Sequence, residues 1–376
     1  MTTDTSVFLY GTLCDPELYR IVAGTEQAPQ AARLAGYCAS WAKDQSFPLI
    51  HADPDGMVEG ILVRPSPRAR ERLDFYELGF GYDIAPLWID GDGGREQALV
   101  YLPPENTWSA GPKWSLETWQ ANHALLAREA AIEYMRLIDT LTPENAAKAF
   151  PQVRMRADSR LRARALPSPS TLPPAMSASS VATQKMTQPY TDYFAVREDI
   201  LTFPRFDGSS SPLIKRASFQ GGDAVTVLPY DPKNDTVLVV RQFRHGPFCR
   251  GDQNPWTLEP AAGRIDPTET PEDAARRELF EEVGITASSL HPCGRYYPSP
   301  GAYSEFLFSY VALADLTEWD GVIGGLSSEA EDIISHVIPL DQALKMASSG
   351  EANTGPLLIS LTWLALNRDN LRKAPT

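Results

Sequence analysis

Three glutamates stand close together at positions 278, 281 and 282. If this segment is helical, their spacing puts them on one face, where like charges repel each other. Arg277 lies four residues before Glu281 and offsets part of this repulsion. The remaining repulsion indicates a cation between Glu278 and Glu282. Ligands that offer only oxygen favour Mg²⁺, with Mn²⁺ as the alternative.

The residues around these acids predict where the helix begins and ends. Thr270 is a good N-cap, and Pro271 suits the first helical position. Gly284 is well placed to terminate the helix. We therefore expect a helix over 271–283, with an apolar face made of Ala274, Ala275, Leu279 and Val283.

The same acids belong to a longer pattern with fixed spacing. Gly263 is followed after five residues by Glu269, and after seven more by Arg277-Glu278-Leu279; Glu281-Glu282 and Gly284-Ile285 complete it. This matches the Nudix box, G-x5-E-x7-R-E-U-x-E-E-x-G-U with U apolar, at every position. Residues 190–376 thus resemble a Nudix hydrolase. The resemblance implies an α/β/α sandwich that hydrolyses a nucleoside diphosphate linked to another moiety.

The resemblance also implies roles for the residues of the box. Glu278 and Glu282 are expected to be catalytic and to bind Mg²⁺, while Arg277 and Glu269 orient the helix and the loop before it. The carbonyl of Ala262 and the carboxylate of Glu281 are further expected ligands. The bound ion would neutralise the pyrophosphate and activate a water molecule for attack on phosphorus.

Segments outside the box resemble the ADP-ribose pyrophosphatase branch of this family. They are VVRQFRHG (239–246), WTLEPAAG (256–263), YYPSPGAYSE (296–305) and GLSSEAEDIISHVIPL (325–340). The last implies Glu329 as general base and Glu331 as an auxiliary metal ligand; a shift of the alignment would exchange them. Arg241 and Arg244 are candidates for phosphate contacts, because a guanidinium suits phosphate; strand arginines that face solvent are the alternative.

The resemblance favours ADP-ribose as substrate, cleaved to AMP and ribose 5-phosphate. GDP-mannose is the alternative within the same branch, and a non-catalytic nucleotide-sugar sensor is a third interpretation. The branch also implies a homodimer through the Nudix domain, in which the segment 193–208 exchanges between the two copies.

The first half of the chain carries a second pattern. Tyr10-Gly11-Thr12-Leu13 follows a predicted strand, and LDFYE spans 73–77. Together they resemble the γ-glutamylcyclotransferase-like (AIG2-like) family, a small β-barrel with helices. The resemblance implies that Tyr10, Gly11, Thr12 and Leu13 bind substrate. It also implies that Glu77 moves a proton while 5-oxoproline leaves a γ-glutamyl amine. Leu78 replaces the glycine that often follows this glutamate, so a degenerate domain is the alternative.

Composition suggests how these parts are joined. We expect a first domain at 1–140, a basic segment and linker at 141–189, and the Nudix domain at 190–376. Residues 167–189 are rich in Pro and Ser, as linkers are. The segment 154–164 carries five arginines, interpreted as a solvated helical face, with an anion-binding or interdomain role as the alternative. Residues 115–141 predict one long amphipathic helix. The combination resembles bacterial tellurite-resistance Nudix proteins.

Charge and composition exclude several classes of partner. The net charge of −14 does not favour binding to nucleic acid or to anionic membranes. The chain has four cysteines and lacks a Cys-x-x-Cys pair, a signal peptide and a long apolar run. The sequence therefore predicts a cytoplasmic protein with reduced thiols.

Overall fold

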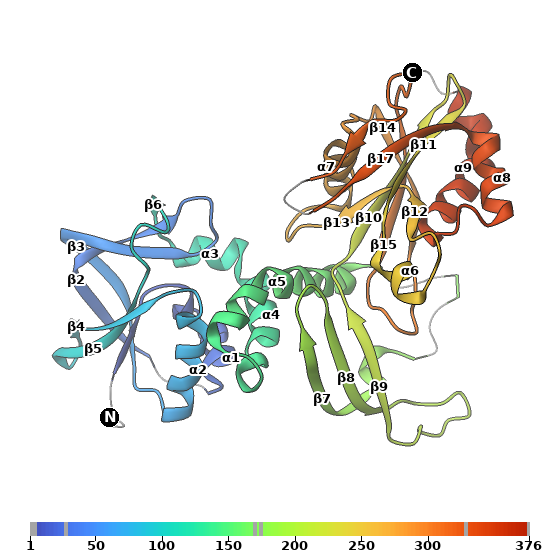
Figure 1. Ribbon diagram of the computed structural model, residues 1–376. Helices are drawn as coiled ribbons and strands as arrows, with labels where there is room; N and C mark the ends of the chain where they lie inside the picture. The colour runs from blue at the N-terminus through green and yellow to red at the C-terminus, as the bar shows by residue number, and fades with distance from the viewer. Residues whose placement is uncertain (1–5, 26–28, 168–170, 173–175, 327–329, 374–376) are drawn as a thin grey trace. The chain divides into compact units, whose positions relative to one another are not determined.

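The computed structural model describes residues 6–25, 29–167, 171–172, 176–326 and 330–373 of the 376 (Figure 1). Contacts divide the chain into two compact units, Met1–Lys215 and Arg216–Thr376. In these described ranges, no helix has both the length and the hydropathy that a membrane crossing requires.

A closed barrel forms the centre of the first unit. Among the described residues, five strands pair around it in the order β3-β1-β5-β4-β2 and back to β3, and the short β6 pairs with the outer part of β2. Alternating apolar residues of these strands fill the interior. The predicted barrel with helices is confirmed. The strands are β1 (Val7–Leu9), β2 (Gln30–Ala42), β3 (Pro48–Val63), β4 (Asp83–Gly91), β5 (Gly94–Leu102) and β6 (Ala110–Lys113).

Helices cover one side of this barrel and share a second core with it. The predicted helix over 115–141 is wrong in one respect. Ser115 caps its start, but the backbone leaves the helical region at His123, so two helices form. No Gly or Pro marks that break in the sequence. The helical elements are η1 (Thr12–Cys14), α1 (Pro16–Ala23), α2 (Pro67–Leu78), α3 (Leu116–Asn122), α4 (Ala124–Tyr134), η2 (Leu137–Asp139) and α5 (Pro143–Ala165).

The arginine-rich segment is the second half of α5, and it faces α4. Arg156 Nε donates to Glu133 at 2.7 Å, and both side chains are buried. Arg160 bridges Glu129 and Glu133, and Arg164 also pairs with Glu129. The prediction of a solvated face is therefore wrong for Arg156 and Arg160, whose side chains are 2% and 28% exposed, whereas the Arg164 side chain is 63% exposed. Their spacing of four residues lines them up with the two acids of α4.

A three-stranded sheet follows α5, made of β7 (Ala182–Thr191), β8 (Ala195–Thr202) and β9 (Ile214–Gln220), with η3 (Ala178–Ser180) before it. The end of the predicted linker thus lies in a strand. The composition of this segment did not predict a strand, because β7 is mostly exposed and is ordered by its pairing with β8. The segment 193–208, expected to exchange between copies, includes β8, which pairs within its own chain.

A sheet between two helical layers forms the second unit (Figure 1). In the residues described, its main order is β14-β15-β10-β11-β17-β16, with β12 beside β11 and β13 beside β10. α7 packs on one face, and α8 and α9 pack on the other, so the predicted α/β/α sandwich is confirmed. The strands are β10 (Ala224–Asp231), β11 (Thr236–Phe243), β12 (Trp256–Glu259), β13 (Ala261–Arg264), β14 (Ser289–Tyr296), β15 (Leu307–Leu313), β16 (Ile323–Gly324) and β17 (Ile333–Pro339). The helices are α6 (His245–Arg250), α7 (Pro271–Val283), α8 (Leu340–Ser349) and α9 (Gly355–Lys373).

Candidate active sites

The helix α7 begins and ends where its cap residues predict. Thr270 Oγ1 accepts a hydrogen bond from the Asp273 backbone N–H at 3.2 Å, and its hydroxyl donates to the Asp273 carboxylate at 2.6 Å. Gly284 ends the helix with a φ of 73°, a conformation that glycine adopts without strain. The predicted helix over 271–283 is therefore confirmed, and it places Glu278, Glu281 and Glu282 as expected.

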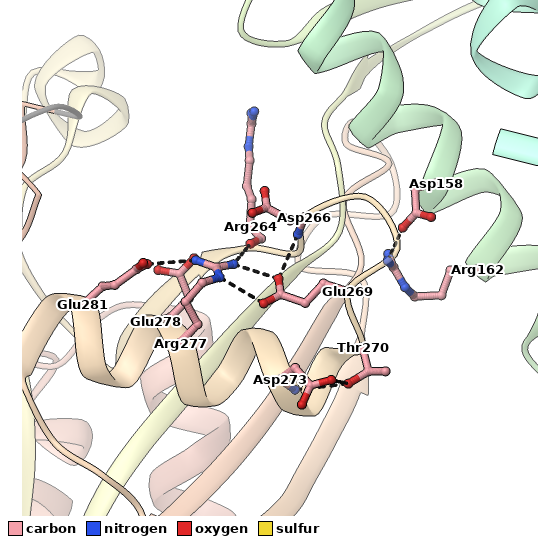
Figure 2. Close-up of polar contacts among 10 residues, drawn as sticks. All are labelled: Asp158, Arg162, Arg264, Asp266, Glu269, Thr270, Asp273, Arg277, Glu278 and Glu281. Atoms are coloured by element: carbon pink, nitrogen blue, oxygen red, sulfur yellow. Dashed lines mark hydrogen bonds and ion pairs between the residues drawn. The ribbon is translucent and has the colours of Figure 1, made fainter. Parts of the chain in front are cut away.

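Arg277 holds the helix and its preceding loop together (Figure 2). Its guanidinium donates to both oxygens of Glu269, at 3.0 and 2.9 Å, and to the Arg264 carbonyl at 2.9 Å. The same group donates to Glu278 at 2.6 Å and to Glu281 at 2.9 Å. These bonds, led by those to Glu269, raise the pKa of Arg277. One cation thus offsets the repulsion among the acids and fixes the loop.

Glu282 is the most buried acid of the group, with 2% of its surface exposed. Its Oε2 accepts from the Ala262 N–H at 3.0 Å, while its Oε1 is buried without a partner in the described residues. Burial raises the pKa of Glu282 well above its ordinary value, and the charges of Glu331 and Glu278 raise it further. The charge of Arg244 offsets only part of this rise, so a carboxylate here is incompletely compensated by positive charge.

Glu278 lies directly against the backbone of β13. A Cβ added at Gly263 would stand 2.0 Å from the Glu278 carboxyl carbon. The glycine of the box is therefore required because the carboxylate occupies the space of a side chain. Glu278 thus lies beside Gly263 and Glu282 beside the N–H of Ala262, on two consecutive residues of β13.

These residues fit a divalent cation. Glu282 offers a buried oxygen without a partner, and the donors are hard oxygen atoms. Within the described chain, three or more His, Cys, Asp or Glu side chains do not converge on one point. Mg²⁺ commonly completes its shell with water and substrate phosphate, so two carboxylates and a carbonyl are a sufficient protein contribution. Arg277 engages the carboxylates of Glu278 and Glu281 alike, so this contact does not distinguish the two as ligands.

The late loop reaches this site through Glu331. Glu331 Oε2 accepts from the Leu326 N–H at 3.1 Å, and the charge of Glu331 helps to raise the pKa of Glu282. Glu329, the expected base, lies outside the described residues. The exchange of roles between these two glutamates therefore stays open.

The two candidate phosphate contacts, Arg241 in β11 and Arg244 directly after it, lie on opposite faces of the sheet. Arg241 lies on the same face of β11 as Val237 and Val239, because every second residue of a strand points to the same side. Val237 and Val239 pack toward α8 and α9. Its charge lowers the pKa of His336 on that face, after burial as the larger cause. This placement is away from α7, so the prediction of a phosphate contact is not favoured for Arg241.

Arg244 lies on the α7 face, because its charge acts on Glu282. Glu259 holds its guanidinium with two oxygens, at 2.9 and 2.7 Å. The sequence analysis missed Glu259, and also Gln242, which is buried on this face with its Nε2 unpartnered in the described residues. The alternation of β11 was the signal that could have found Gln242.

The second site is in the first unit, at the end of α2. Glu77 is half-buried, and its charge raises the pKa of Tyr10, Tyr76 and Tyr82, each of them after burial as the main cause. Burial raises the pKa of Glu77 itself to about 7. Its place in the last turn of α2 adds to this, since the C-terminal end of a helix disfavours negative charge.

The Tyr10–Leu13 loop lies beside this carboxyl. The hydroxyl of Tyr10 donates to the Tyr101 carbonyl at 2.8 Å, which fixes the ring. The turn that begins at Thr12 has no side-chain cap, and its first N–H groups have no acceptor within the turn. These groups are suited to an anionic ligand.

Leu78, the departure from the family pattern, does not enter this site directly. Its side chain packs against the first unit's core. The glycine stands one position later, at Gly79, where a Cβ would lie 2.2 Å from the Pro143 carbonyl oxygen. The glycine is thus needed for the close approach of α5.

Comparisons with known proteins match both halves of the chain. The NUDIX domain model matches residues 221–358. The chain is 34% identical over 187 residues to the ADP-ribose pyrophosphatase of Haemophilus influenzae, covering 49% of this chain and 86% of that protein. The chain belongs to the Nudix family. Its second half is a Nudix hydrolase domain, with the box on α7 and the loop before it.

Three further comparisons extend this result. The ADP-ribose pyrophosphatase of Escherichia coli K12 is 36% identical over 167 residues, 44% of this chain and 79% of that protein. The GDP-mannose pyrophosphatase of Salmonella paratyphi B is 31% identical over 173 residues, 46% of this chain and 88% of that protein. Residues 7–121 match the model described as gamma-glutamyl cyclotransferase, AIG2-like.

Gly263→Ala tests the position of Glu278. The new methyl group displaces the Glu278 carboxylate, and a shift of about 1 Å can lower a rate roughly 100-fold. We expect hydrolase turnover to fall by about that factor while thermal unfolding changes little. Gly246→Ala is the control, because a Cβ there meets nothing within 4 Å. Equal turnover of the two variants would contradict this account of Gly263.

Glu77→Gln tests whether the Glu77 carboxyl is buried, through the pH dependence of the free energy of unfolding. Because the pKa in the folded protein is about 7 against an ordinary 4.5, protonated Glu77 favours folding. This contribution is complete below about pH 4.5 and is lost as the pH rises through 7. We expect the wild type to lose about 3 kcal/mol relative to the Gln variant between pH 4.5 and pH 8. Denaturant unfolding at both pH values measures the difference; a constant difference would show that Glu77 is not buried as described.

Proposed function

We propose that the Nudix domain hydrolyses the pyrophosphate of ADP-ribose to AMP and ribose 5-phosphate with Mg²⁺. The buried, unpartnered oxygen of Glu282 beside Glu278 carries this proposal. The names of the relatives from Haemophilus influenzae and Escherichia coli support ADP-ribose. The relative from Salmonella paratyphi B keeps GDP-mannose as the alternative sugar nucleotide.

Each residue of the site has a stated task in this proposal. Mg²⁺ held by Glu278, Glu282 and the Ala262 carbonyl would neutralise pyrophosphate charge and lower the pKa of an attacking water. Arg277 holds the Glu278 carboxylate and, through Glu269, the loop before the helix. Arg244, fixed by Glu259, adds positive charge on the same face. Glu329 takes the proton of the water, and Glu331 is an auxiliary ligand of the metal. In the alternative, the two glutamates exchange these roles.

Glu282→Gln distinguishes this proposal from a nucleotide-sugar sensor. The amide keeps the shape and the hydrogen-bonding capacity of the side chain but loses the negative charge. We expect turnover of ADP-ribose to fall at least about 1,000-fold, while the folded state keeps its thermal transition. Product formation is measured with ADP-ribose, GDP-mannose, NADH and diadenosine compounds. Wild-type protein that binds ADP-ribose but hydrolyses none of the panel would favour the sensor.

We also propose that the Nudix domain forms a homodimer. Phe243, Phe248 and Trp256 support this, because they lie 44–58% exposed with ring centroids 5.9 and 5.6 Å apart. Exposed aromatic clusters are typical of protein interfaces. We expect light scattering to give a dimer for the wild type and for Leu366→Glu, an exposed control on α9. Phe248→Glu should give a monomer; a monomeric wild type would contradict the proposal.

A second activity is proposed for the first unit. Glu77 has a pKa of about 7, a value suited to giving and taking protons near neutral pH. The match to a gamma-glutamyl cyclotransferase model supports release of 5-oxoproline from γ-glutamyl compounds. The nucleotide-sugar chemistry is assigned to 190–376, and the γ-glutamyl chemistry to 1–140 together with α5.

A further inference from the structure

A histidine and a cysteine lie in contact on the surface of α6. His245 and Cys249 are four residues apart, so the helix places both side chains on one face. The Sγ atom of Cys249 is 3.3 Å from Nε2 and 3.6 Å from Nδ1 of His245. Both side chains are exposed, and the thiol is free. Imidazole nitrogen and thiolate sulfur are typical ligands of Zn²⁺, and residues at this spacing on a helix can bind one ion together.

The separation of the two side chains fits a shared tetrahedral ion. Zn²⁺ binds sulfur at about 2.3 Å and imidazole nitrogen at about 2.0–2.1 Å, which at a tetrahedral angle puts the ligand atoms about 3.5 Å apart. The distances from the sulfur to the two ring nitrogens lie on either side of this value. The His245 ring also stacks on Phe248, with centroids 6.1 Å apart, which limits its orientations. The pair therefore needs little rearrangement to hold the ion.

The charged neighbours of this pair do not oppose a cation. Arg244, the N-cap residue of α6, is held by Glu259 at 2.7 Å. Arg250, at the last position of the helix, is paired with Asp252. Each guanidinium thus has a carboxylate beside it, and the surroundings of His245 and Cys249 gain little net positive charge.

One chain supplies two of the four ligands that a structural zinc site requires. In the parts of the chain that the structure describes, three or more His, Cys, Asp or Glu side chains do not gather at one point. The exposed aromatic cluster of Phe243, Phe248 and Trp256 surrounds α6 and supports the proposed homodimer. In a two-fold dimer the same patch of both copies faces itself, so an axis through this cluster brings the two α6 helices together.

We propose that His245 and Cys249 of two copies together bind one tetrahedral Zn²⁺ ion. This inference rests on the proposed homodimer. Each thiol releases its proton on binding, because the thiolate is the ligand. The two thiolates balance the charge of the ion, so the complex is neutral and can be enclosed between aromatic surfaces without the cost of a buried charge.

Metal uptake and assembly of the full-length protein test the inference. Metal-free protein is titrated with Zn²⁺ alone and with Co²⁺ alone, in excess Mg²⁺ to occupy the acids of α7 and with a phosphine reductant to prevent a disulfide. Co²⁺ reports thiolate ligands by charge-transfer absorption, and its visible spectrum distinguishes tetrahedral from octahedral sites. We expect one ion per two chains. Zn²⁺ should lower the dissociation constant of the dimer at least about 10-fold, because the ion binds the dimer and not the monomer.

Three variants assign the ligands. Cys249→Ser and His245→Asn should each weaken Co²⁺ binding at least about 100-fold, and Cys249→Ser should also abolish the thiolate absorption. Both positions are exposed, so thermal unfolding of the metal-free variants should match the wild type. Cys38→Ser is the control, because it removes a thiol from β2 of the first unit and should bind Co²⁺ as the wild type does.

The outcomes separate this inference from the homodimer on which it rests. A metal-free dimer that takes up no Co²⁺ through thiolate keeps the homodimer and overturns the zinc site. A metal-free monomer that dimerises only with Zn²⁺ supports the zinc site and shows that the aromatic cluster alone does not hold the copies together. One ion per chain without a dimer overturns both. Uptake that persists in Cys249→Ser also overturns the inference, because the ion then binds elsewhere.

Discussion

Mutual repulsion among the acids of α7 is the constraint on which the Nudix site depends. Glu278, Glu281 and Glu282 share a face, and one guanidinium meets the first two while it reaches the loop through Glu269. Among the residues that the structure describes, no hydrogen bond joins Arg277 to Glu282, so Arg277 does not compensate the charge of the most buried acid in this way. The helix is therefore stable as a scaffold while one carboxyl stays in need of a cation. The ion pairs of Arg277 stabilise the helix, whereas Glu282 provides the affinity for a cation.

The two units solve a similar problem in different ways. Both place a glutamate where burial raises its pKa. At Glu282 two nearby acids add to the effect, which favours capture of a metal ion. At Glu77 the neighbours are tyrosines, which stay neutral, so the carboxyl keeps a pKa near neutrality and is suited to moving protons. The chemistry follows from the charge of the neighbours more than from the acid itself.

Local signals in the sequence predicted much of this protein. Thr270, Pro271 and Gly284 fixed both ends of α7, because caps act within one turn. The box residues predicted the sandwich and the position of Glu278 and Glu282. The predictions that failed concerned features that depend on contacts with residues distant in the sequence. The break at His123 has no Gly or Pro, and β7 is a polar strand ordered by its neighbour. Arg241 and Arg244 look alike in sequence, and only the fold places the charge of Arg241 near His336 and that of Arg244 near Glu282.

The pairing of α5 with α4 sets a limit on how the first unit can be shortened. Glu129 and Glu133 are buried, and their cationic partners Arg156, Arg160 and Arg164 all come from beyond residue 142. A fragment that stops at residue 140 would retain the barrel and the Glu77 loop but leave those two acids without their cationic partners, and one that stops at residue 121 would lose α4 and both acids as well. The smallest autonomous piece of this unit therefore extends through Ala165, well past the part that sequence similarity marks.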